Sequence, residues 1–394
     1  MATALSLGER GRLTAPPNPW VGCVLERDGE VVGTGFHRAP GEPHAEVVAL
    51  AEAGDRARGA TAWLTLEPCS HQGRTPPCAP ALLAAGVVRV VVALSDPDPR
   101  VAGRGIGQLR AAGVDVEVGP GADAARRSLR PYLHHRSTGR PLCLLKAAVT
   151  LDGRTAAADG SSQWITGPEA RLDTHRLRAE SQAVVVGAGT ALADRPMLNV
   201  RHGPGVRGVP DMDGVRGVPD TDGVRGVPDT DGVRGVPDTE DVPRQPLRVL
   251  LDATGRVPAD GPLFDPDLAA TLVLTTPAAG KEAVKAWLDA GADVEVVPPA
   301  AGGSGVDLVA ALTVLGGRGV LQAMVEGGPT LHGALVRAGL VDHMVLYVGG
   351  RLLGAAGLPL LAGPGPATIA EAPEWRITAS RILGADVRLD CEPV

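Results

Sequence analysis

Residues 41–50 read GEPHAEVVAL and residues 67–78 read EPCSHQGRTPPC, and these two runs decide how the first part of the chain folds. They contain His44, Cys69 and Cys78, and an imidazole with two thiolates is a ligand set that Zn²⁺ favours. Three protein ligands leave the fourth position of a tetrahedral site open, as in catalytic zinc sites, whereas a structural site normally has four. The runs therefore predict a fold built around a catalytic metal centre.

Glu46 stands two residues after His44, and Pro68 directly precedes Cys69, which is the pattern of zinc-dependent nucleobase deaminases. Deamination of an aminopyrimidine needs hydroxide near neutral pH, and Zn²⁺ lowers the pKa of a bound water enough to supply it. At the start of a helix, His44 and Glu46 send their side chains into one pocket. We therefore expect Glu46 to carry a proton from water to the ring nitrogen and to the leaving ammonia, without binding the metal.

The third zinc ligand is harder to assign from the sequence. In the most common pattern the second cysteine stands three positions after the first, where this chain has Gln72. Cys78 is the next cysteine, and His71 is an alternative ligand. A loop from Cys69 to Cys78 brings the second thiolate onto a helix that we expect to begin near Pro80. We prefer Cys78 on this geometry, and because nucleobase deaminases use one histidine and two cysteines.

Bulk composition limits the class of protein. The chain has 394 residues, which exceeds the usual size of one hydrophobic core and favours two domains. Hydrophobic residues are 44% of the sequence but aromatic residues only 2%, which favours cores of small aliphatic side chains and an α/β architecture. The net charge of −7 argues against a protein that grips a nucleic-acid backbone. We find no signal peptide, no window of 18 apolar residues and too few cysteines for a disulfide framework, so we expect a cytoplasmic protein with a small-molecule substrate.

Two series of alternating strands and helices divide the chain. The first begins with a hairpin that turns at Asp28-Gly29, and its expected helices are 44–54, 80–85 and 107–112, with strands at 62–66, 87–94 and 115–118. A second series starts after the polar, basic stretch 132–140, where PLCLLKAAVTLDG opens a new strand. Its expected strands are 183–186, 247–251, 271–275, 319–325 and 343–348. We therefore expect two α/β domains, 1–140 and 141–394.

Residues 205–240 are a repeat: GVRGVPDMD is followed by GVRGVPDTD twice and by GVRGVPDTE once. Nonapeptide repeats can form calcium-binding β-rolls, but that motif needs Gly-Gly-x-Gly-x-Asp and an apolar residue in each coil, and here proline recurs in every unit. Units rich in Gly, Pro and Asp favour a disordered insertion within the second domain. Such an insertion in a surface loop costs little stability.

With PNPWVGCV at residues 17–24, the two opening runs closely resemble the deaminase domain of the bifunctional riboflavin-biosynthesis deaminase/reductase family, over about residues 15–140. The resemblance implies a cytidine-deaminase-like three-layer α/β/α domain. The zinc ligands that it implies are His44, Cys69 and Cys78, with Glu46 as the proton carrier.

The same resemblance implies two contacts to the substrate. Asn18 is expected on the pyrimidine, and the polar loop 70–75, with Arg74, is expected to face the substrate phosphate. For Asn18, a turn cap between two prolines is the alternative interpretation.

Two strand-to-helix turns of the second half contain glycines: residues 187–190 read GAGT and residues 326–330 read EGGPT. Glycines allow close approach of a backbone, Pro329 suits the first position of a helix, and free N–H groups at that helix start can hold a phosphate. Neither turn is the G-x-G-x-x-G fingerprint of dinucleotide sites. An ordinary strand-to-helix turn is therefore the alternative interpretation.

Five further runs occur in the order seen in the reductase domain of the same family: LKAAVTLDGRTA, SSQWITGPEAR, HRLRAES, VGAGTALADRPMLNVR and VEGGPTLHGALVRAGLVDH. The resemblance covers roughly residues 141–394 without the repeat, and it implies a dihydrofolate-reductase-like α/β domain that uses NADPH. The residues implied to lie along NADPH are Ala148, Trp164, Thr190, Asp194, Gly328, Pro329, Thr330, Leu331, His332, Gly333 and Ala334. Those implied to line the substrate are Ser162, Arg178, Leu198, Arg201 and Glu326.

The resemblance also implies the reactions. The first is zinc-dependent hydrolytic deamination of 2,5-diamino-6-(5-phosphoribosylamino)pyrimidin-4-one, and the second is NADPH-dependent reduction of the ribosyl side chain to ribityl, giving 5-amino-6-(5-phosphoribitylamino)uracil. Two arginines suit the ribose phosphate, and Lys146 with Glu326 are candidate polar partners at the reduced carbon. For Lys146, a strand-edge charge in solvent is the alternative interpretation. The resemblance further suggests a homo-oligomer formed through the reductase domains.

The chain departs from the family pattern at Arg195, where Asp is usual, and at Asn199, where Thr is usual. The added positive charge either changes cofactor contacts or lies on the surface. Two rival functions are a deaminase of tRNA or another nucleobase with a non-catalytic second domain, and a zinc-stabilised scaffold that binds partners through the repeat. The acidic net charge and the attached second domain argue against the first rival.

Overall fold

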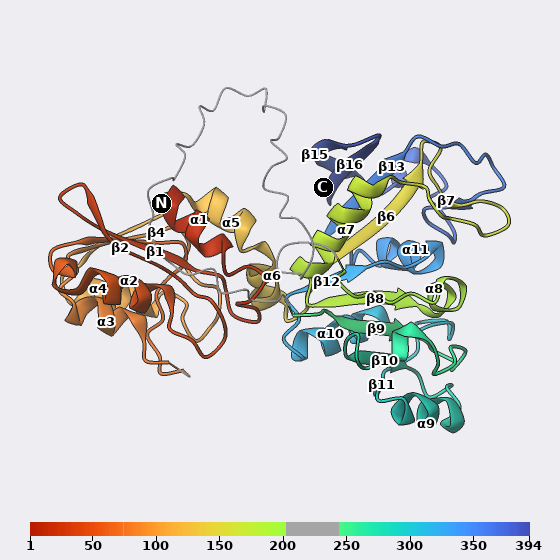
Figure 1. Ribbon diagram of the computed structural model, residues 1–394, viewed down its shortest axis with the longest axis horizontal. Coiled ribbons are helices and arrows are strands. Elements are labelled where there is room, and N and C mark those ends of the chain that lie inside the picture. The colour runs from red at the N-terminus through yellow and green to blue at the C-terminus, as the bar shows by residue number, and fades with distance from the viewer. Residues whose placement is uncertain (74, 202–243) are drawn as a thin grey trace.

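The computed structural model describes residues 1–73, 75–201 and 244–394. Arg74 and the repeat 205–240 lie outside the described residues, so the expectations for them rest on the sequence alone. The described strands form a five-stranded sheet, a nine-stranded sheet and a two-stranded ribbon. The five-stranded sheet lies within residues 1–140 and the nine-stranded sheet within 141–394, on the left and right of Figure 1.

The five-stranded sheet has the strand order β2-β1-β3-β4-β5. β1 (Gly22–Arg27) and β2 (Glu30–Phe36) form the expected hairpin, whose turn residues Asp28 and Gly29 both have positive φ, 54° and 83°. β1 also pairs antiparallel with β3 (Thr61–Leu64), while β3, β4 (Arg89–Val92) and β5 (Asp115–Val118) are parallel. The carboxyl ends of β3 and β4 therefore meet at one edge.

Helices cover both faces of this sheet and make the three-layer α/β/α arrangement (Figure 1). α1 (Ala2–Glu9) and α5 (Ala122–Ser128) lie on one face, and α2 (Ala45–Ala53), α3 (Cys78–Ala84) and α4 (Arg104–Ala111) lie on the other. α2 approaches β2 closely, because a Cβ on Gly35 would lie 2.2 Å from the carbonyl oxygen of Ala45. Glycine at position 35 thus lets the first turn of α2 rest on the sheet.

The polar stretch at the expected domain boundary forms α6 (Arg130–Thr138), with Pro131 in its first turn and Gly139 as a left-handed cap. Beside α6 lies a cluster of buried apolar residues, named here the junction cluster: Ala15, Trp20, Leu66, Ala93, Leu94, Ala125, Leu129, Tyr132 and Leu321. Leu321 comes from the second half of the chain and is fully buried in this cluster. The two halves therefore share part of one core.

The nine-stranded sheet has the order β11-β10-β9-β8-β12-β6-β13-β16-β15. Neighbouring strands from β11 to β13 are parallel, and β16 and β15 add an antiparallel edge. The bounds are β6 (Leu142–Thr150), β8 (Ala183–Gly187), β9 (Leu247–Leu251), β10 (Thr271–Thr275), β11 (Asp293–Val296), β12 (Gln322–Val325), β13 (His343–Gly349), β15 (Trp375–Leu383) and β16 (Asp386–Pro393). The ribbon pairs β7 (Arg154–Ala156) with β14 (Leu358–Pro359).

Helices pack on both faces of the nine-stranded sheet. α7 (Pro168–Glu180) covers the central strands on one face through Ala170 and Leu177, and α10 (Leu308–Gly317) and α11 (Pro329–Arg337) pack on the other. α8 (Ala188–Asp194) and α9 (Lys281–Asp289) follow β8 and β10. All four residues of β12 are buried, as a parallel strand covered on both faces requires.

The strands expected at 115–118, 247–251 and 271–275 have these bounds in the structure. Two helix starts were expected too late: α3 begins at Cys78 rather than near Pro80, and α4 begins at Arg104 rather than 107. In both cases the first turn contains glycine or proline, which local propensity treats as helix breakers although they are tolerated at a helix start. None of the described helices is both long and apolar enough to cross a membrane.

Candidate active sites

The predicted zinc ligands come together where two helices begin. His44 caps the N-terminus of α2, Cys78 is the first residue of α3, and Cys69 lies in the loop after β3. His44 Nδ1 lies 3.3 Å from Cys78 Sγ and 3.6 Å from Cys69 Sγ, and the three ligand atoms lie within 4.8 Å of one another. One imidazole and two sulfurs at this separation fit a Zn²⁺ ion with an open position. The alternative ligand His71 does not belong to this group.

Hydrogen bonds around Cys69 favour its thiolate. The hydrogen bond with the Cys78 side chain is the main cause, and with those from His44 and the Cys78 backbone N–H, the last at 3.3 Å, it outweighs burial and lowers the pKa of Cys69 to about 4. The same side-chain hydrogen bond, followed by burial, raises the pKa of Cys78. The two sulfurs thus share one proton, and a metal ion held by Cys69 and Cys78 would displace it.

Thr75 orients the histidine ligand. His44 Nε2 lies 3.2 Å from Thr75 Oγ1, on the opposite side of the ring from the sulfurs. A partner on the second ring nitrogen selects the tautomer and the plane of a metal-binding imidazole, so that Nδ1 faces the cysteines. Sequence reasoning did not single out Thr75 for this contact, because a hydroxyl partner in a loop has no fixed spacing from its histidine.

Glu46 is the second residue of α2 and only 3% exposed. Burial raises its pKa, although the positive charge of His44 opposes the shift. A carboxylate with a raised pKa is a stronger base, which suits a group that must accept a proton from water. Glu46 lies beside the ligand group, since its side chain forms a hydrogen bond with Cys78, and its role as the proton carrier stays a prediction.

Asn18 is held by a residue that sequence reasoning missed. Its Nδ2 lies 3.0 Å from His37 Nε2, and His37 Nδ1 lies 3.1 Å from the carbonyl oxygen of Pro43. Burial lowers the pKa of His37, so its ring is neutral, and Nδ1–H donates to Pro43 while Nε2 accepts from the Asn18 amide. This chain of bonds fixes the amide orientation and leaves Asn18 Oδ1 as an acceptor. No motif marks His37, which lies directly after β2.

Glu67, in the Glu-Pro-Cys run, organises the neighbouring loop. Its buried carboxylate accepts hydrogen bonds from four backbone N–H groups at 3.0–3.3 Å, those of Asp96, Gly103, Gly105 and Ile106. Two of these donors belong to the first turn of α4, where a negative charge is favourable. The carboxylate therefore ties the segment that carries Cys69 to the end of β4.

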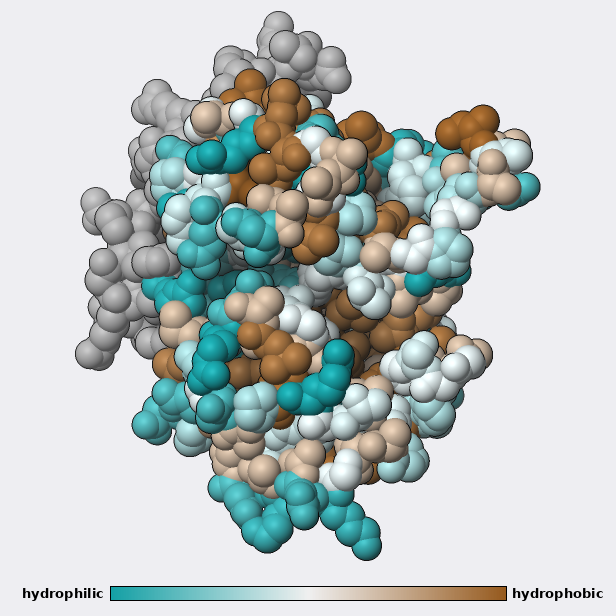
Figure 2. Space-filling model, turned by 90° about the vertical axis from the view of Figure 1, so that its right-hand side faces the viewer, coloured by the Kyte–Doolittle hydropathy of each residue, from teal (hydrophilic) through white to brown (hydrophobic). Residues whose placement is uncertain are grey.

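A cavity of about 1300 Å³ opens at the carboxyl ends of β8, β9 and β12. Its walls include residues 187–190 after β8, Thr254 and Arg256 after β9, and 326–331 after β12. Figure 2 looks onto this end of the second domain, where a hollow is bordered by hydrophobic (brown) as well as hydrophilic (teal) residues. Its size suits a dinucleotide together with a substrate.

Seven of the predicted cofactor residues line this cavity: Thr190, Asp194, Gly328, Pro329, Thr330, Leu331 and Ala334. Pro329 occupies the first turn of α11, as expected. A Cβ on Gly328 would lie 3.3 Å from Thr190 Oγ1, and one on Gly327 would lie 2.8 Å from Leu331, so larger residues would fill the turn. The glycines and the free N–H groups at this helix start fit the phosphates of a nicotinamide cofactor.

The other predicted cofactor residues, Ala148, Trp164, His332 and Gly333, are not part of the cavity wall. Trp164 is 57% exposed and its ring lies 4.3 Å below the Arg171 guanidinium. His332 is 1% exposed, and burial lowers its pKa to about 4. Their contact with a cofactor remains a prediction.

The predicted substrate residues Arg178 and Glu326 form a buried ion pair next to Lys146. Arg178 Nη2 lies 2.9 Å from Glu326 Oε2, Arg178 Nε also donates to Glu326, and Lys146 Nζ lies 3.7 Å from Glu326 Oε2. Burial opposes ionisation of Glu326, but the charges of Arg178 and Lys146 outweigh it and lower its pKa to about 2. Burial lowers the pKa of Lys146. The interpretation of Lys146 as a solvent-exposed edge charge is wrong, because β6 lies between β12 and β13 and its side chain is 16% exposed.

Asn199, one of the departures from the family pattern, joins the two predicted substrate arginines. Its backbone oxygen accepts from Arg178 Nη1 at 3.1 Å, and its Oδ1 accepts from Arg201 Nη1 at 3.2 Å. Leu198 beside it is 2% exposed and has a positive φ of 54°, while Ser162 lines the cavity. Sequence reasoning marked Asn199 only as a departure and missed this link.

Arg195, the other departure, caps α8 and forms an ion pair with Asp260 at 3.3 Å. Its side chain is 56% exposed, and the residue does not belong to the cavity wall. The added charge thus lies on the surface, and Asp260 neutralises it.

Family models match parts of both domains. Residues 141–389 match the family of the RibD C-terminal domain, and residues 1–94 match the cytidine and deoxycytidylate deaminase zinc-binding region. The riboflavin biosynthesis protein RibD of Escherichia coli is 42% identical over 99% of this chain and 97% of its own length, and that of Chlamydia muridarum is 43% identical over 92% and 87%.

Solved structures show the same arrangement. Acinetobacter baumannii RibD is 36% identical and superposes with a TM-score of 0.82, covering 100% of this chain and 97% of its own. A diaminohydroxyphosphoribosylaminopyrimidine deaminase/5-amino-6-(5-phosphoribosylamino)uracil reductase from Thermotoga maritima is 26% identical, with a TM-score of 0.79 and the same coverage.

Fold and sites together define a zinc-dependent deaminase joined to an α/β reductase with a nicotinamide cofactor. The chain belongs to the RibD family of riboflavin-biosynthesis proteins. It is a bifunctional deaminase/reductase enzyme, and the expected family, fold class and enzyme class are confirmed.

Proposed function

We propose that the chain deaminates 2,5-diamino-6-(5-phosphoribosylamino)pyrimidin-4-one in its first domain and reduces the ribosyl group of the product to ribityl in its second, giving 5-amino-6-(5-phosphoribitylamino)uracil. The observation that carries the proposal is the presence of both sites in one chain: the His44, Cys69 and Cys78 group in domain 1–140, and the buried Arg178–Glu326 pair beside a large cavity in domain 141–394.

In the deaminase domain, His44, Cys69 and Cys78 hold the metal and Glu46 moves the protons. Zn²⁺, when bound, supplies hydroxide near neutral pH. Glu46 takes a proton from water and delivers it to the ring nitrogen and then to the departing ammonia. Its raised pKa supports the first transfer, because a raised pKa makes the Glu46 carboxylate a stronger base towards the proton of water. Asn18 Oδ1, oriented by His37, accepts a hydrogen bond from an N–H group of the pyrimidine.

In the reductase domain, Arg201 binds the substrate phosphate, and the Lys146–Glu326 pair acts in proton transfer to the ribose. Burial and the neighbouring charge of Arg178 lower the pKa of Arg201. Its guanidinium still carries a positive charge at neutral pH, and its forked N–H donors suit a phosphate. The cofactor, when bound, supplies the hydride for C1 of the ribose. Lys146 donates the proton to the ribose oxygen that leaves C1 when the ring opens, and Glu326 holds the Lys146 ammonium in place.

We propose NADPH rather than NADH as the reductant. Arg256 lines the same cavity as the glycine turn, and its side chain is exposed. A cation on the wall of the cavity supports a cofactor with an additional phosphate. A ratio of kcat/KM for NADPH over NADH near one would contradict this choice.

We also propose that the chain forms a homo-oligomer through the reductase domain. β15 is the edge strand of the nine-stranded sheet, and its seven central residues are all exposed, including Ile377 at 59% and Ile382 at 78%. A long edge strand with exposed apolar side chains pairs readily with another chain. Light scattering of the wild type and of an Ile377→Lys, Ile382→Lys variant tests the assembly, and equal masses would contradict it.

A reducing compartment, such as the cytoplasm, suits this protein. Its five cysteines are free, and two of them form the metal group. Oxidation of Cys69 and Cys78 to a disulfide would remove both thiolates, so the deaminase needs reduced thiols.

Mass spectrometry of the products, with and without NADPH, tests the proposed function. We expect the deaminated uracil to accumulate without NADPH and to convert to the ribityl compound with it. If the diamino substrate is unchanged in both reactions, the deaminase assignment is wrong. If the deaminated uracil persists with NADPH, the reductase assignment is wrong.

A further inference from the structure

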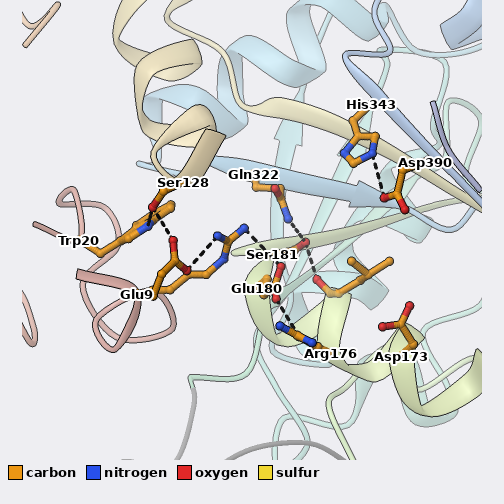
Figure 3. A network of polar contacts seen from close by, with 12 residues as sticks. Glu9, Trp20, Ser128, Asp173, Arg176, Glu180, Ser181, Gln322, His343 and Asp390 are labelled. Carbon is orange, nitrogen blue, oxygen red and sulfur yellow. Dashed lines mark hydrogen bonds and ion pairs between the residues drawn. The ribbon is translucent and has the colours of Figure 1, made fainter. Parts of the chain in front are cut away.

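A segment of the deaminase domain reaches the reductase domain close to its predicted substrate site. Arg12 Nη2 lies 3.4 Å from Glu180 Oε2 in the other domain, and Arg12 Nη1 lies 3.2 Å from Glu9 Oε2 in its own. The Arg12 guanidinium also lies 5.4 Å from the centre of the Trp20 ring. Trp20 Nε1 donates to Ser128 Oγ at 3.1 Å, and the Ser128 hydroxyl donates to Glu9 (Figure 3). Arg12 is therefore held from its own domain while it binds the other.

Glu180 is an unfavourable residue for its place in the helix. It is the last residue of α7, where the negative end of the helix dipole repels a carboxylate. Two arginines offset this: Arg176 Nε lies 3.2 Å from Glu180 Oε1, and Arg12 lies against Oε2. The Arg176 side chain is 62% exposed and that of Arg12 only 26%, so water screens the Arg12 interaction less. Glu180 is thus placed to receive a cation from the deaminase domain.

The same turn of α7 carries Arg178, whose guanidinium binds both carboxylate oxygens of Glu326. The turn is also tied to β12, because Gln322 Nε2 donates to Ser181 Oγ at 3.0 Å just after Glu180 (Figure 3). Only Ala179 separates Arg178 from Glu180 along the helix α7. A displacement of Glu180 therefore moves Arg178 relative to Glu326.

A second contact joins the same segment to β12, the strand that Glu326 directly follows. A Cβ on Gly319, just before β12, would lie 3.3 Å from Pro17 Cβ. The carbonyl oxygen of Pro17 accepts from Arg136 Nη2 at 3.3 Å. Segment 12–20, which carries Asn18 of the deaminase site, therefore touches both α7 and the approach to β12. These are the two elements that supply the Arg178–Glu326 pair.

We infer that Arg12 of the deaminase domain is a positioning residue for the reductase: by holding Glu180, it fixes the last turn of α7 and keeps Arg178 in register with Glu326 in the substrate site. The inference rests on the proposed function for the identity of the substrate. Arg12 is not part of the cavity wall, so we expect it to affect substrate binding by the reductase through Arg178.

The test compares full-length Arg12→Ala, Arg12→Lys, Glu180→Gln and Arg176→Ala with the wild type. The reductase is assayed with separately prepared deaminated substrate, and calorimetry measures the Kd of the ribityl product. We expect Arg12→Ala and Glu180→Gln to raise KM for the substrate and Kd for the product about fivefold, with kcat and KM for NADPH within about twofold. Arg12→Lys retains the charge and should restore most of the affinity.

Arg176→Ala is the matched control, because it removes the other cation on the same carboxylate without touching the deaminase domain, and it should leave KM unchanged. The double variant Arg12→Ala, Glu180→Gln should be no weaker than either single variant, since both remove one interaction. Equal KM values for Arg12→Ala and Arg176→Ala would overturn the inference, as would a fall in kcat without a change in KM. If Arg12→Ala does not fold, Glu180→Gln and Arg12→Lys decide the question. A wild type that binds no product contradicts the proposed function instead.

Discussion

The two active sites of this chain are assembled in different ways. The deaminase site takes its metal ligands from two helix starts and one loop, between His44 and Cys78, and a bound metal ion would link them. The reductase site takes charged side chains from β6, α7 and the end of β12, between Lys146 and Glu326, and holds them through ion pairs. The two sites have no side chain in common, so loss of a group in one site leaves the groups of the other in place. Substitutions should therefore separate the two sites sharply.

The sharpest separation is expected for Glu46→Gln. The amide keeps the size of the side chain but cannot carry the proton, so deamination should fall about 10³- to 10⁴-fold. Reduction of the deaminated substrate by the same preparation should be unchanged. Ammonia release and NADPH oxidation, measured in parallel, check both. Substantial deamination by Glu46→Gln would show that another group moves the proton.

Glu326→Gln should give the converse result, with a smaller effect on activity. Loss of this carboxylate leaves Arg178 and Lys146 buried without their counter-charge, which costs about 3 kcal/mol of stability. We expect reductase kcat/KM to fall about 10²-fold while deamination persists. Denaturant unfolding, together with both assays, measures the two effects. A variant as stable as the wild type would show that the pair contributes no net stabilisation.

At acidic pH, His332 should lower the stability of the reductase domain. Burial lowers the pKa of His332 to about 4 from an ordinary 6.5, so the folded protein binds fewer protons at this group than the unfolded chain. Its contribution to stability is complete above pH 6.5 and declines as the pH falls towards 4, by about 2 kcal/mol at pH 5. Unfolding of wild type and His332→Asn at pH 7.5 and 5 checks this. The variant should lose less stability between these pH values.

Replacing His37 with phenylalanine should moderately weaken the binding of the substrate to the deaminase site. The change removes the partner of Asn18 Nδ2, so the amide is free to rotate and its acceptor oxygen no longer faces one direction. We expect KM of the deaminase substrate to rise about tenfold, in line with the loss of one buried hydrogen bond, with the reductase unaffected. An unchanged KM would show that Asn18 is oriented by other contacts.

The smallest effect is expected for Arg195→Asp, which restores the usual family residue. Arg195 lies on the surface and pairs with Asp260, and exposed ion pairs contribute little. KM for NADPH should stay within about twofold of the wild-type value. A larger change would mean that the reductase cavity extends to Arg195 when the cofactor is bound.

The different origins of the sites also explain what the sequence could predict. Zinc chemistry needs particular residue types at close spacing, so His44, Cys69, Cys78 and Glu46 stand out in the sequence alone. Parallel strands bring Lys146 and Glu326 together only because β6 lies beside β12, and no local pattern encodes that neighbour. The reductase residues were therefore accessible mainly through family resemblance.

The residues that sequence reasoning missed are those that orient others. His37, Thr75 and Asn199 act through hydrogen bonds to partners whose distance along the chain varies, from two residues for Asn199 and Arg201 to 31 for Thr75 and His44. Such contacts follow from the folded geometry rather than from spacing. The C-terminal hairpin β15–β16 was missed as well, because the central residues of β15 are exposed on both faces and lack the alternation that identifies a half-buried strand.

Leu321 makes the two catalytic halves poor candidates for separation into independent polypeptides. If the two halves were expressed as separate chains divided between α6 and β6, the deaminase fragment would have a cavity in the junction cluster. The reductase fragment would expose Leu321 to solvent. Such fragments should be recovered in soluble form more readily when they are co-expressed than when each is made alone, since each supplies the missing surface of the other. The covalent linkage of the two domains thus also keeps the buried surface of each one covered by the other.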